Sequence, residues 1–145
     1  MVGTDRVGAD RSAVPEGPGD AVDASTSAGT PTPAEALVER HVSAFNAKDL
    51  DALLADFTED ARWVTGDYAV PAGGLRDFFG QAMSAVLPTL TVVRVIDGGE
   101  SVVAEMTEEW TYEGVVKSAA LLAVFDLEEG RIARAKIYRE GSADA

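Results

Sequence analysis

The pattern of apolar residues after position 31 predicts two amphipathic helices joined by a short turn. Thr32, Pro33 and Glu35 indicate the start of the first helix, because this order is typical of a capping box with proline in the first turn. The apolar face of this helix consists of Leu37, Val38, His41, Val42 and Phe45. His41 is the only histidine of the chain, and it interrupts a face that has to turn inward.

The second helix begins after residues 46–48, with Asp49 as its cap. Its inward face is predicted to carry Leu50, Leu53, Leu54 and Phe57. A short strand is expected at about 61–65, followed by a loop over 66–74, where glycines and a proline cluster. A third helix, stopped by Pro88, has the apolar face Leu75, Phe78, Phe79, Met83, Val86 and Leu87.

The remaining pattern predicts strands at 91–96, 101–112, 117–127 and 131–139, separated by turns rich in Gly, Asp and Glu. Helices that precede a mostly antiparallel sheet indicate an α+β fold. We expect a strongly curved sheet that forms a cone-shaped barrel, closed by the three N-terminal helices and enclosing a cavity.

Composition sets the limits of this domain. Residues 1–31 are rich in Gly, Pro, Ser, Asp and Ala and contain no aromatic residue, so they are predicted to be a disordered tail. The cone domain is expected to span 32–141, and residues 142–145 form a C-terminal tail.

The net charge of −13, from 25 acidic and 12 basic residues, argues against nucleic acid and membrane partners. The absence of cysteine removes thiolate metal sites and cysteine nucleophiles. With one histidine, no usual metal site can be assembled, and we expect no metal or other cofactor. No export signal is visible, and the longest apolar run, at 119–125, is too short to span a membrane. The chain is therefore expected to be cytoplasmic. Its Arg, Ala, Gly and Val usage hints at a bacterial source.

Two stretches carry a family resemblance: AFNAKDLDALLADFTEDARW at 44–63 and VFDLEEGRIARAKIYRE at 124–140. They resemble the nuclear transport factor 2-like superfamily, and more narrowly its SnoaL-like branch with polyketide cyclases, ketosteroid isomerases and limonene-epoxide hydrolases. The resemblance covers about residues 33–140. It implies the cone fold and a homodimer.

The catalytic sets of these relatives are mostly replaced here. His41 stands where ketosteroid isomerases have a tyrosine, while Thr65 and Ala123 stand where they have aspartates. The limonene-epoxide hydrolases use an Asp-Arg-Asp set, of which Glu108 retains one acid, while Met106 and Ile137 replace the arginine and the second aspartate. Trp63 and Thr65 replace their supporting tyrosine and asparagine. The polyketide cyclases usually employ an Asp/His pair late in the chain, and this chain has no second histidine to supply it there.

The resemblance also places the even-numbered residues of strand 101–112 on the inward face, consistent with strand alternation. The predicted cavity is therefore large and mostly apolar. Its predicted substrate-binding residues are Phe45, Trp63, Asp67, Tyr68, Met106, Trp110, Tyr112, Leu121, Phe125, Ile137 and Arg139. Arg139 would either pair with an acid or reach toward solvent.

Glu108 and His41 are the candidate catalytic residues. Burial among apolar side chains would raise the pKa of the Glu108 carboxyl and suit it to proton transfer. A shift of one residue would instead turn Glu108 to solvent. His41 would act as an acid, a base or a hydrogen-bond donor, or serve only as a core residue. If both enter the cavity, they could orient and charge each other.

These residues favour a cofactor-free cyclase or isomerase for a lipophilic, polyketide-like intermediate, which would fit antibiotic biosynthesis. The enzyme would shape its substrate and assist by acid/base catalysis, and a concerted ring closure is compatible with so few polar groups. The first alternative is a protein that binds a small molecule without catalysis, and the second is an epoxide hydrolase. A purely structural role through the outer sheet face also stays open.

Overall fold

The computed structural model describes residues 30–85 and 87–140. Most of the predicted N-terminal tail, the C-terminal tail and Val86 lie outside the described residues. The chain divides into two units, Met1–Pro33 and Ala34–Ala145. Apart from Pro33, every helix and strand below belongs to the second unit. No helix among the described residues combines the length and the apolar character needed to cross a membrane.

The described residues form three helices, α2 (Pro33–Ala47), α3 (Leu50–Ala55) and α4 (Leu75–Ser84). The Asp49 side chain caps α3 as predicted and accepts a hydrogen bond from the backbone N–H of Ala52 at 3.1 Å. Helix α4 ends before the predicted position, because Ala85 is already extended. Pro88 also disfavours a helical conformation at Leu87, which lies beyond the helix.

Within residues 30–85 and 87–140 the strands are β3 (Phe57–Thr65), β4 (Tyr68–Val70), β5 (Thr89–Asp97), β6 (Ser101–Tyr112), β7 (Val115–Glu128) and β8 (Arg131–Arg139). The predicted start of the first strand at 61 was wrong, because Phe57 belongs to β3 and not to the helix before it. The predicted loop at 66–74 contains β4, which folds back on β3 through a turn at Gly66, where φ is +58°.

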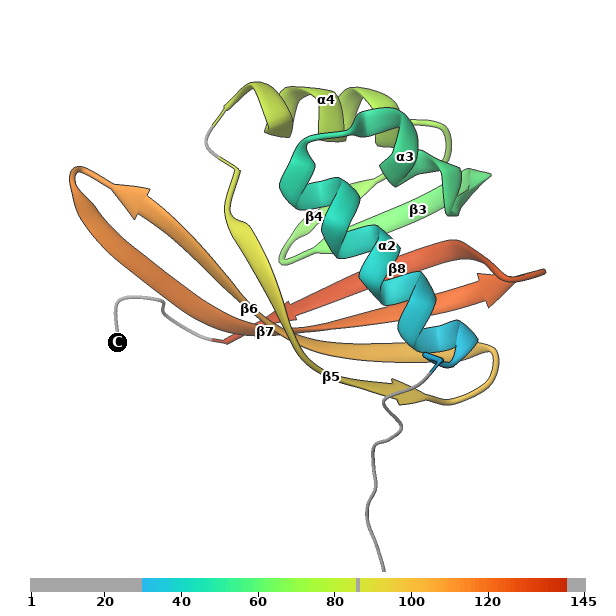
Figure 1. The fold of residues 1–145 in the computed structure, drawn as a ribbon. Coiled ribbons are helices and arrows are strands. Elements are labelled where there is room, and N and C mark those ends of the chain that lie inside the picture. The colour runs from blue at the N-terminus through green and yellow to red at the C-terminus, as the bar shows by residue number, and fades with distance from the viewer. Residues whose placement is uncertain (1–29, 86, 141–145) are drawn as a thin grey trace, which may run out of the picture. The chain divides into compact units, whose positions relative to one another are not determined.

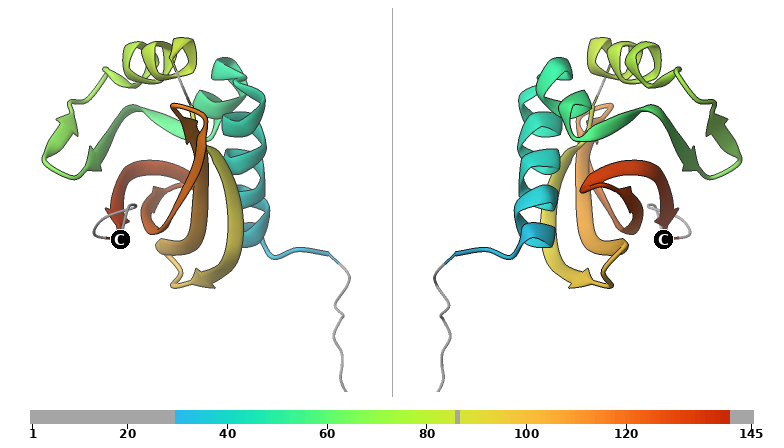
Figure 2. Two further views of the ribbon diagram at one scale, coloured as in Figure 1. Left: turned by 90° about the vertical axis from the view of Figure 1, so that its left-hand side faces the viewer. Right: turned by 90° about the vertical axis from the view of Figure 1, so that its right-hand side faces the viewer.

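The strands form one sheet in the order β4-β3-β8-β7-β6-β5, in which only β3 and β8 are parallel neighbours. The predicted α+β class is confirmed. The sheet is strongly curved, as the side views in Figure 2 show, but it is not closed into a barrel, since β4 and β5 remain as its two edges. Helix α2 crosses the concave face, while α3 and α4 lie over β3 and β4 (Figure 1).

The strand registers align the inward residues into rows across the sheet. These rows are Val102–Phe125–Ala135–Trp63, Ala104–Ala123–Ile137–Thr65 and Met106–Leu121–Arg139. Ala104, Ala123 and Ala135 are each 0% exposed, and their small side chains leave room for the larger side chains of α2. The last row brings Arg139 of β8 to the same end of the sheet as Glu108 of β6, whose partner on β7 is the small Ala119.

Asn46, near the end of α2, ties this helix to the edge strand β5. Its Nδ2 donates to the carbonyl of Leu90 at 2.9 Å, and its Oδ1 accepts from the Leu90 N–H at 2.8 Å. The amide thus satisfies both backbone groups of Leu90 that face away from β6. These two hydrogen bonds hold the end of α2 against the edge of the sheet, over its concave face.

We expect Asn46→Ala to lower the free energy of unfolding by about 1–3 kcal/mol, because it leaves two partly buried backbone groups without a partner. Urea unfolding followed by circular dichroism measures the change. Ser43→Ala, on an exposed position of the same helix, serves as the control and should differ little from the wild type. Equal stability of the two variants would show that the Asn46 contacts do not anchor α2.

Candidate active site

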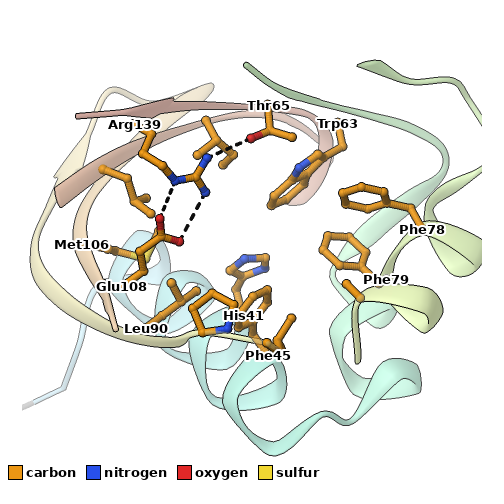
Figure 3. Close-up of a pocket in the computed structure, with 15 residues that line it drawn as sticks. His41, Phe45, Trp63, Thr65, Phe78, Phe79, Leu90, Met106, Glu108 and Arg139 are labelled. Carbon is orange, nitrogen blue, oxygen red and sulfur yellow. Dashed lines mark hydrogen bonds and ion pairs between the residues drawn. The ribbon is translucent and has the colours of Figure 1, made fainter. Parts of the chain in front are cut away.

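A pocket lies between α2, α4 and the concave face of the sheet (Figure 3). Its volume is about 150 Å³. The predicted large cavity is therefore a small one, because the almost completely buried rings of Phe57 and Phe125 pack against His41 and fill the space behind it. A cavity of this size holds about one aromatic ring.

Many of the predicted site residues meet in this pocket. From that set, the lining includes His41, Phe45, Trp63, Met106, Glu108, Leu121, Ile137 and Arg139. The inward register of β6 holds through Glu108, while its neighbour Glu109 is exposed, so the one-residue shift does not occur.

Other predicted residues lie elsewhere. Phe125 is buried behind His41, with the two ring centroids 5.2 Å apart. Tyr68 is 57% exposed and stacks on Phe78, and Asp67 lies in the exposed turn before it. Trp110 lines a separate hollow, and Tyr112 is 58% exposed.

The positions of Trp110 and Tyr112 have a common cause. Strand β5 begins at Thr89, opposite Glu109, so the last residues of β6 extend past the neighbouring strand. The hairpin of β6 and β7 projects beyond the helices in Figure 1. The resemblance and strand alternation predicted that both side chains line the pocket, but neither Trp110 nor Tyr112 is among its lining residues.

Sequence reasoning missed several residues of the pocket wall. They are Thr65, Phe78, Phe79, Ala82, Leu87, Pro88 and Leu90. The apolar face of the third predicted helix contained Phe78 and Phe79, so their periodicity was a usable signal. The contributions of Leu87, Pro88 and Leu90 depend on where the chain re-enters the sheet after α4, which no local pattern reveals.

Glu108 is held by Arg139. Only 5% of Glu108 is exposed, whereas 42% of the Arg139 side chain is exposed, which places the guanidinium at the mouth of the pocket. Arg139 Nε donates to Glu108 Oε2, and Arg139 Nη2 donates to Oε1 at 3.3 Å. Arg139 Nη1 also donates to Thr65 Oγ1 at 3.4 Å. The two contacts to Glu108 make the planar, bidentate pair that arginine forms best with a carboxylate.

His41 occupies the apolar side of the pocket and is 1% exposed. Its ring lies among those of Phe45, Phe57, Trp63 and Phe125, at centroid distances of 5.2 to 6.3 Å. Desolvation lowers the pKa of His41 from 6.5 to about 4, while the charge of Asp56 acts in the opposite direction. His41 is therefore neutral near pH 7.

The nitrogen Nδ1 of His41 is buried and has no hydrogen-bond partner within the part of the chain that the structure describes. In that same part, His41 and Glu108 form no hydrogen bond or ion pair with each other; the partner of Glu108 is Arg139. The two candidate catalytic groups thus line one pocket but do not orient each other.

The described residues contain no group of three or more His, Cys, Asp or Glu side chains placed to hold a metal ion. The chemistry that this pocket can supply from its own side chains is a paired carboxylate, a guanidinium at the mouth and a neutral imidazole. Aromatic and aliphatic side chains form the remaining wall.

We expect His41→Leu to match or exceed the wild type in stability near pH 7, because a buried polar atom without a partner costs about 1–3 kcal/mol. As the pH falls from 6.5 toward 4, the unfolded wild-type chain takes up a proton at His41 that the folded protein does not. The wild type should therefore lose about 2–3 kcal/mol more than the variant between about pH 7 and about pH 4.5.

Urea unfolding of both proteins at the two pH values measures this difference. The carboxylates titrate in both proteins, so their contribution cancels in the comparison. Equal losses of stability in the wild type and in His41→Leu between the two pH values would show that His41 is not held neutral by burial.

Comparison with known proteins identifies the family. A structure of a candidate polyketide cyclase from Xanthomonas campestris pv. campestris is 26% identical, with a TM-score of 0.63, covering 73% of this chain and 89% of that one. An LEH-like epoxide hydrolase from M. tuberculosis is 19% identical, with a TM-score of 0.66, covering 74% and 83%.

An NTF2-like protein of unknown function from Burkholderia pseudomallei is 20% identical, with a TM-score of 0.68, covering 76% of this chain and 92% of that one. These similarities support the NTF2-like fold. A search of curated proteins finds no match. Residues 38–135 match the SnoaL-like domain, and this chain therefore belongs to the SnoaL-like family.

Proposed function

We propose that this SnoaL-like protein is a cofactor-free cyclase or isomerase that acts on a lipophilic, polyketide-like carbonyl compound. The observation that carries the proposal is the Glu108–Arg139 pair on the wall of an otherwise apolar pocket. Apolar walls with a few convergent polar groups are typical of sites for lipophilic ligands. A candidate polyketide cyclase among the fold neighbours agrees with this choice of substrate.

The pair suits proton transfer next to a carbonyl group. The Glu108 carboxylate would accept a proton from the carbon beside the carbonyl, and the electron pair of that C–H bond would move into an enolate. A donor group of Arg139 lies beside the carboxylate and would stabilise the negative charge on the enolate oxygen.

The second half of the reaction depends on the substrate. In the isomerisation of a β,γ-unsaturated carbonyl compound, the enolate is conjugated with the double bond, and Glu108 returns the proton to the far carbon of this dienolate. In a ring closure, the enolate carbon attacks a second carbonyl of the same molecule, and Glu108 returns the proton to the new alkoxide. No co-reactant is required in either case.

Neutral His41 and the aromatic wall would position the substrate. An imidazole that is uncharged near pH 7 can donate or accept one hydrogen bond to a substrate oxygen without adding a charge to the apolar wall. Trp63 and Phe79 pack edge to face at 4.9 Å, and they present a rigid aromatic surface. Holding two reacting carbons close together removes entropy from the barrier to ring closure.

A non-catalytic binding protein is the main alternative. Its support is that both oxygens of Glu108 already accept hydrogen bonds from Arg139, so the carboxylate has a partner before any substrate arrives. Epoxide hydrolysis has less support, because the pocket positions of Met106 and Ile137 carry no group that activates water or an epoxide oxygen.

Exchange of the carbon-bound hydrogens of 2-tetralone for deuterium, followed by proton NMR in D₂O, tests the proposal. We expect the wild type to accelerate exchange, and Glu108→Gln to slow the catalysed rate by about 100-fold or more, because it removes the base. Glu109→Gln is the matched control: it makes the same change in charge on the adjacent, exposed residue and should leave the rate unchanged.

Binding of 2-tetralone to the wild type without accelerated exchange would favour the binding protein. Equal exchange rates for Glu108→Gln and the wild type would remove Glu108 from the role of base.

A further inference from the structure

Thr65 brings a hydroxyl group to the polar end of the pocket. It is the last residue of β3 and pairs with Ile137 of β8 in one of the rows of inward residues. Arg139 lies two residues beyond Ile137, on the same face of β8. Its side chain therefore passes the end of β3, and Figure 3 shows the guanidinium between Thr65 and Glu108.

The contact with Arg139 determines what the Thr65 hydroxyl can do. Arg139 Nη1 donates a hydrogen bond to Thr65 Oγ1 at 3.4 Å. A guanidinium has no acceptor, so Thr65 cannot donate back to it, and the O–H bond of Thr65 has to point elsewhere. Because Thr65 is half-buried in the pocket wall, the space open to this O–H includes the pocket. The positive charge of its partner also makes this O–H a stronger donor, since hydrogen bonds in series polarise one another.

Arg139 keeps donors for a ligand beside this hydroxyl. A guanidinium has five N–H groups in a fixed plane. Within residues 30–85 and 87–140, Nε and one N–H of Nη2 bind the Glu108 carboxylate, and one N–H of Nη1 binds Thr65. The remaining N–H groups, on Nη1 and Nη2, belong to the edges that Glu108 does not occupy. A carbonyl oxygen placed there would meet donors from both Arg139 and Thr65.

We propose that Thr65 is a further catalytic residue, whose O–H binds the same substrate carbonyl oxygen as the free N–H groups of Arg139. This inference rests on the proposed function, since it completes the oxyanion site of that reaction. Thr65 donates a hydrogen bond and loses no proton. The bond strengthens as Glu108 removes the proton from carbon, because negative charge then builds up on the oxygen.

The same contact sets the orientation of the substrate. Its carbonyl group lies at the mouth of the pocket, beside Thr65 and the partly exposed Arg139. Its apolar body then points inward, toward the aromatic wall that includes Trp63 and Phe79. In this orientation the carbon beside the carbonyl lies next to Glu108.

Two substitutions separate the hydroxyl group from the shape of the side chain. Thr65→Val replaces the hydroxyl by a methyl group and keeps the branched shape, whereas Thr65→Ser keeps the hydroxyl. In the exchange of 2-tetralone in D₂O, we expect Thr65→Val to lower kcat by about 10- to 100-fold with little change in KM, because the lost bond acts mainly on the charged oxygen. Thr65→Ser should stay within about threefold of the wild type, since its hydroxyl makes the same bond. Thr107→Val, the same change on an exposed residue of β6, is the matched control and should leave kcat unchanged.

Binding of phenol and benzene tests the contact without catalysis. Each compound has one ring, and only phenol has an oxygen that Thr65 could reach. Their dissociation constants are measured from the shift of the Trp63 indole N–H resonance in ¹⁵N-labelled protein. We expect Thr65→Val to raise the ratio of the phenol constant to the benzene constant about fivefold, the value of one hydrogen bond. Thr65→Ser and Thr107→Val should leave this ratio unchanged.

The substitution Arg139→Lys distinguishes direct contact from positioning. Lysine keeps a positive charge beside Glu108 but lacks the planar fork that also reaches Thr65. If Thr65 contacts the ligand itself, adding Thr65→Val to Arg139→Lys should still raise the ratio of the phenol constant to the benzene constant. An unchanged ratio in this background would show that Thr65 acts only by holding Arg139, and the inference would be wrong.

Failure of this inference differs from failure of the proposed function. Equal kcat values for Thr65→Val and the wild type would remove Thr65 from catalysis and leave Glu108 as the base. A loss of rate that Thr65→Ser does not restore would also contradict the inference, because the hydroxyl is then not its cause. If Thr65→Val raises the binding ratio but the wild type does not accelerate exchange, Thr65 binds the ligand oxygen and the catalytic role is overturned.

Discussion

The structure depends on the cover that α2 gives to the concave face of the sheet. The rows of inward residues across β6, β7 and β8 are almost entirely apolar, and exposing them to water would be unfavourable. Alanines at three positions leave room for the larger side chains of the helix, and Asn46 binds the helix to the edge strand. His41 and Phe45 lie on the covering face of α2, so the same packing that stabilises the domain also places them at the pocket.

The two candidate catalytic groups are both buried, but only one of them has a polar partner. Arg139, reaching from β8 past Ala119, supplies Glu108 with the opposite charge and two hydrogen bonds. His41 has no such partner among the described residues; burial favours its neutral form, and one ring nitrogen is left unsatisfied there. Natural proteins accept such local costs mostly at functional sites, where stability is exchanged for activity.

Much of the fold was predictable because its signals are local. The bounds of β6 and β8 agree with the predicted strands at 101–112 and 131–139, and the Asp49 cap was visible as a residue type in the right place. Phe57 misled the prediction, since its spacing from Leu53 and Leu54 fits a helix as well as it fits the start of a strand. Strand β4 is only three residues long, which is too short for any period to be seen.

The site was only partly predictable. His41 and Glu108 stood out as polar residues on apolar faces, and that contrast is a local signal. The pairing of Glu108 with Arg139 depends on the registers of three strands, so it could not be read from either residue alone. The size of the pocket depends on how tightly Phe57 and Phe125 pack behind His41, and the exposure of Tyr112 depends on where β5 begins.

The place of β8 in the sheet has a consequence for synthesis of the chain. This strand is the last of the sheet to be made, yet it lies between β3 and β7, and β3 has no other neighbour than β4. During translation the β3–β4 hairpin therefore has to wait, with one edge unpaired, until the ribosome has released the residues of β8. Such long-range pairing is slow and leaves edges open to wrong partners. We expect nascent chains to be most dependent on chaperones in the interval between the emergence of β3 and the docking of β8.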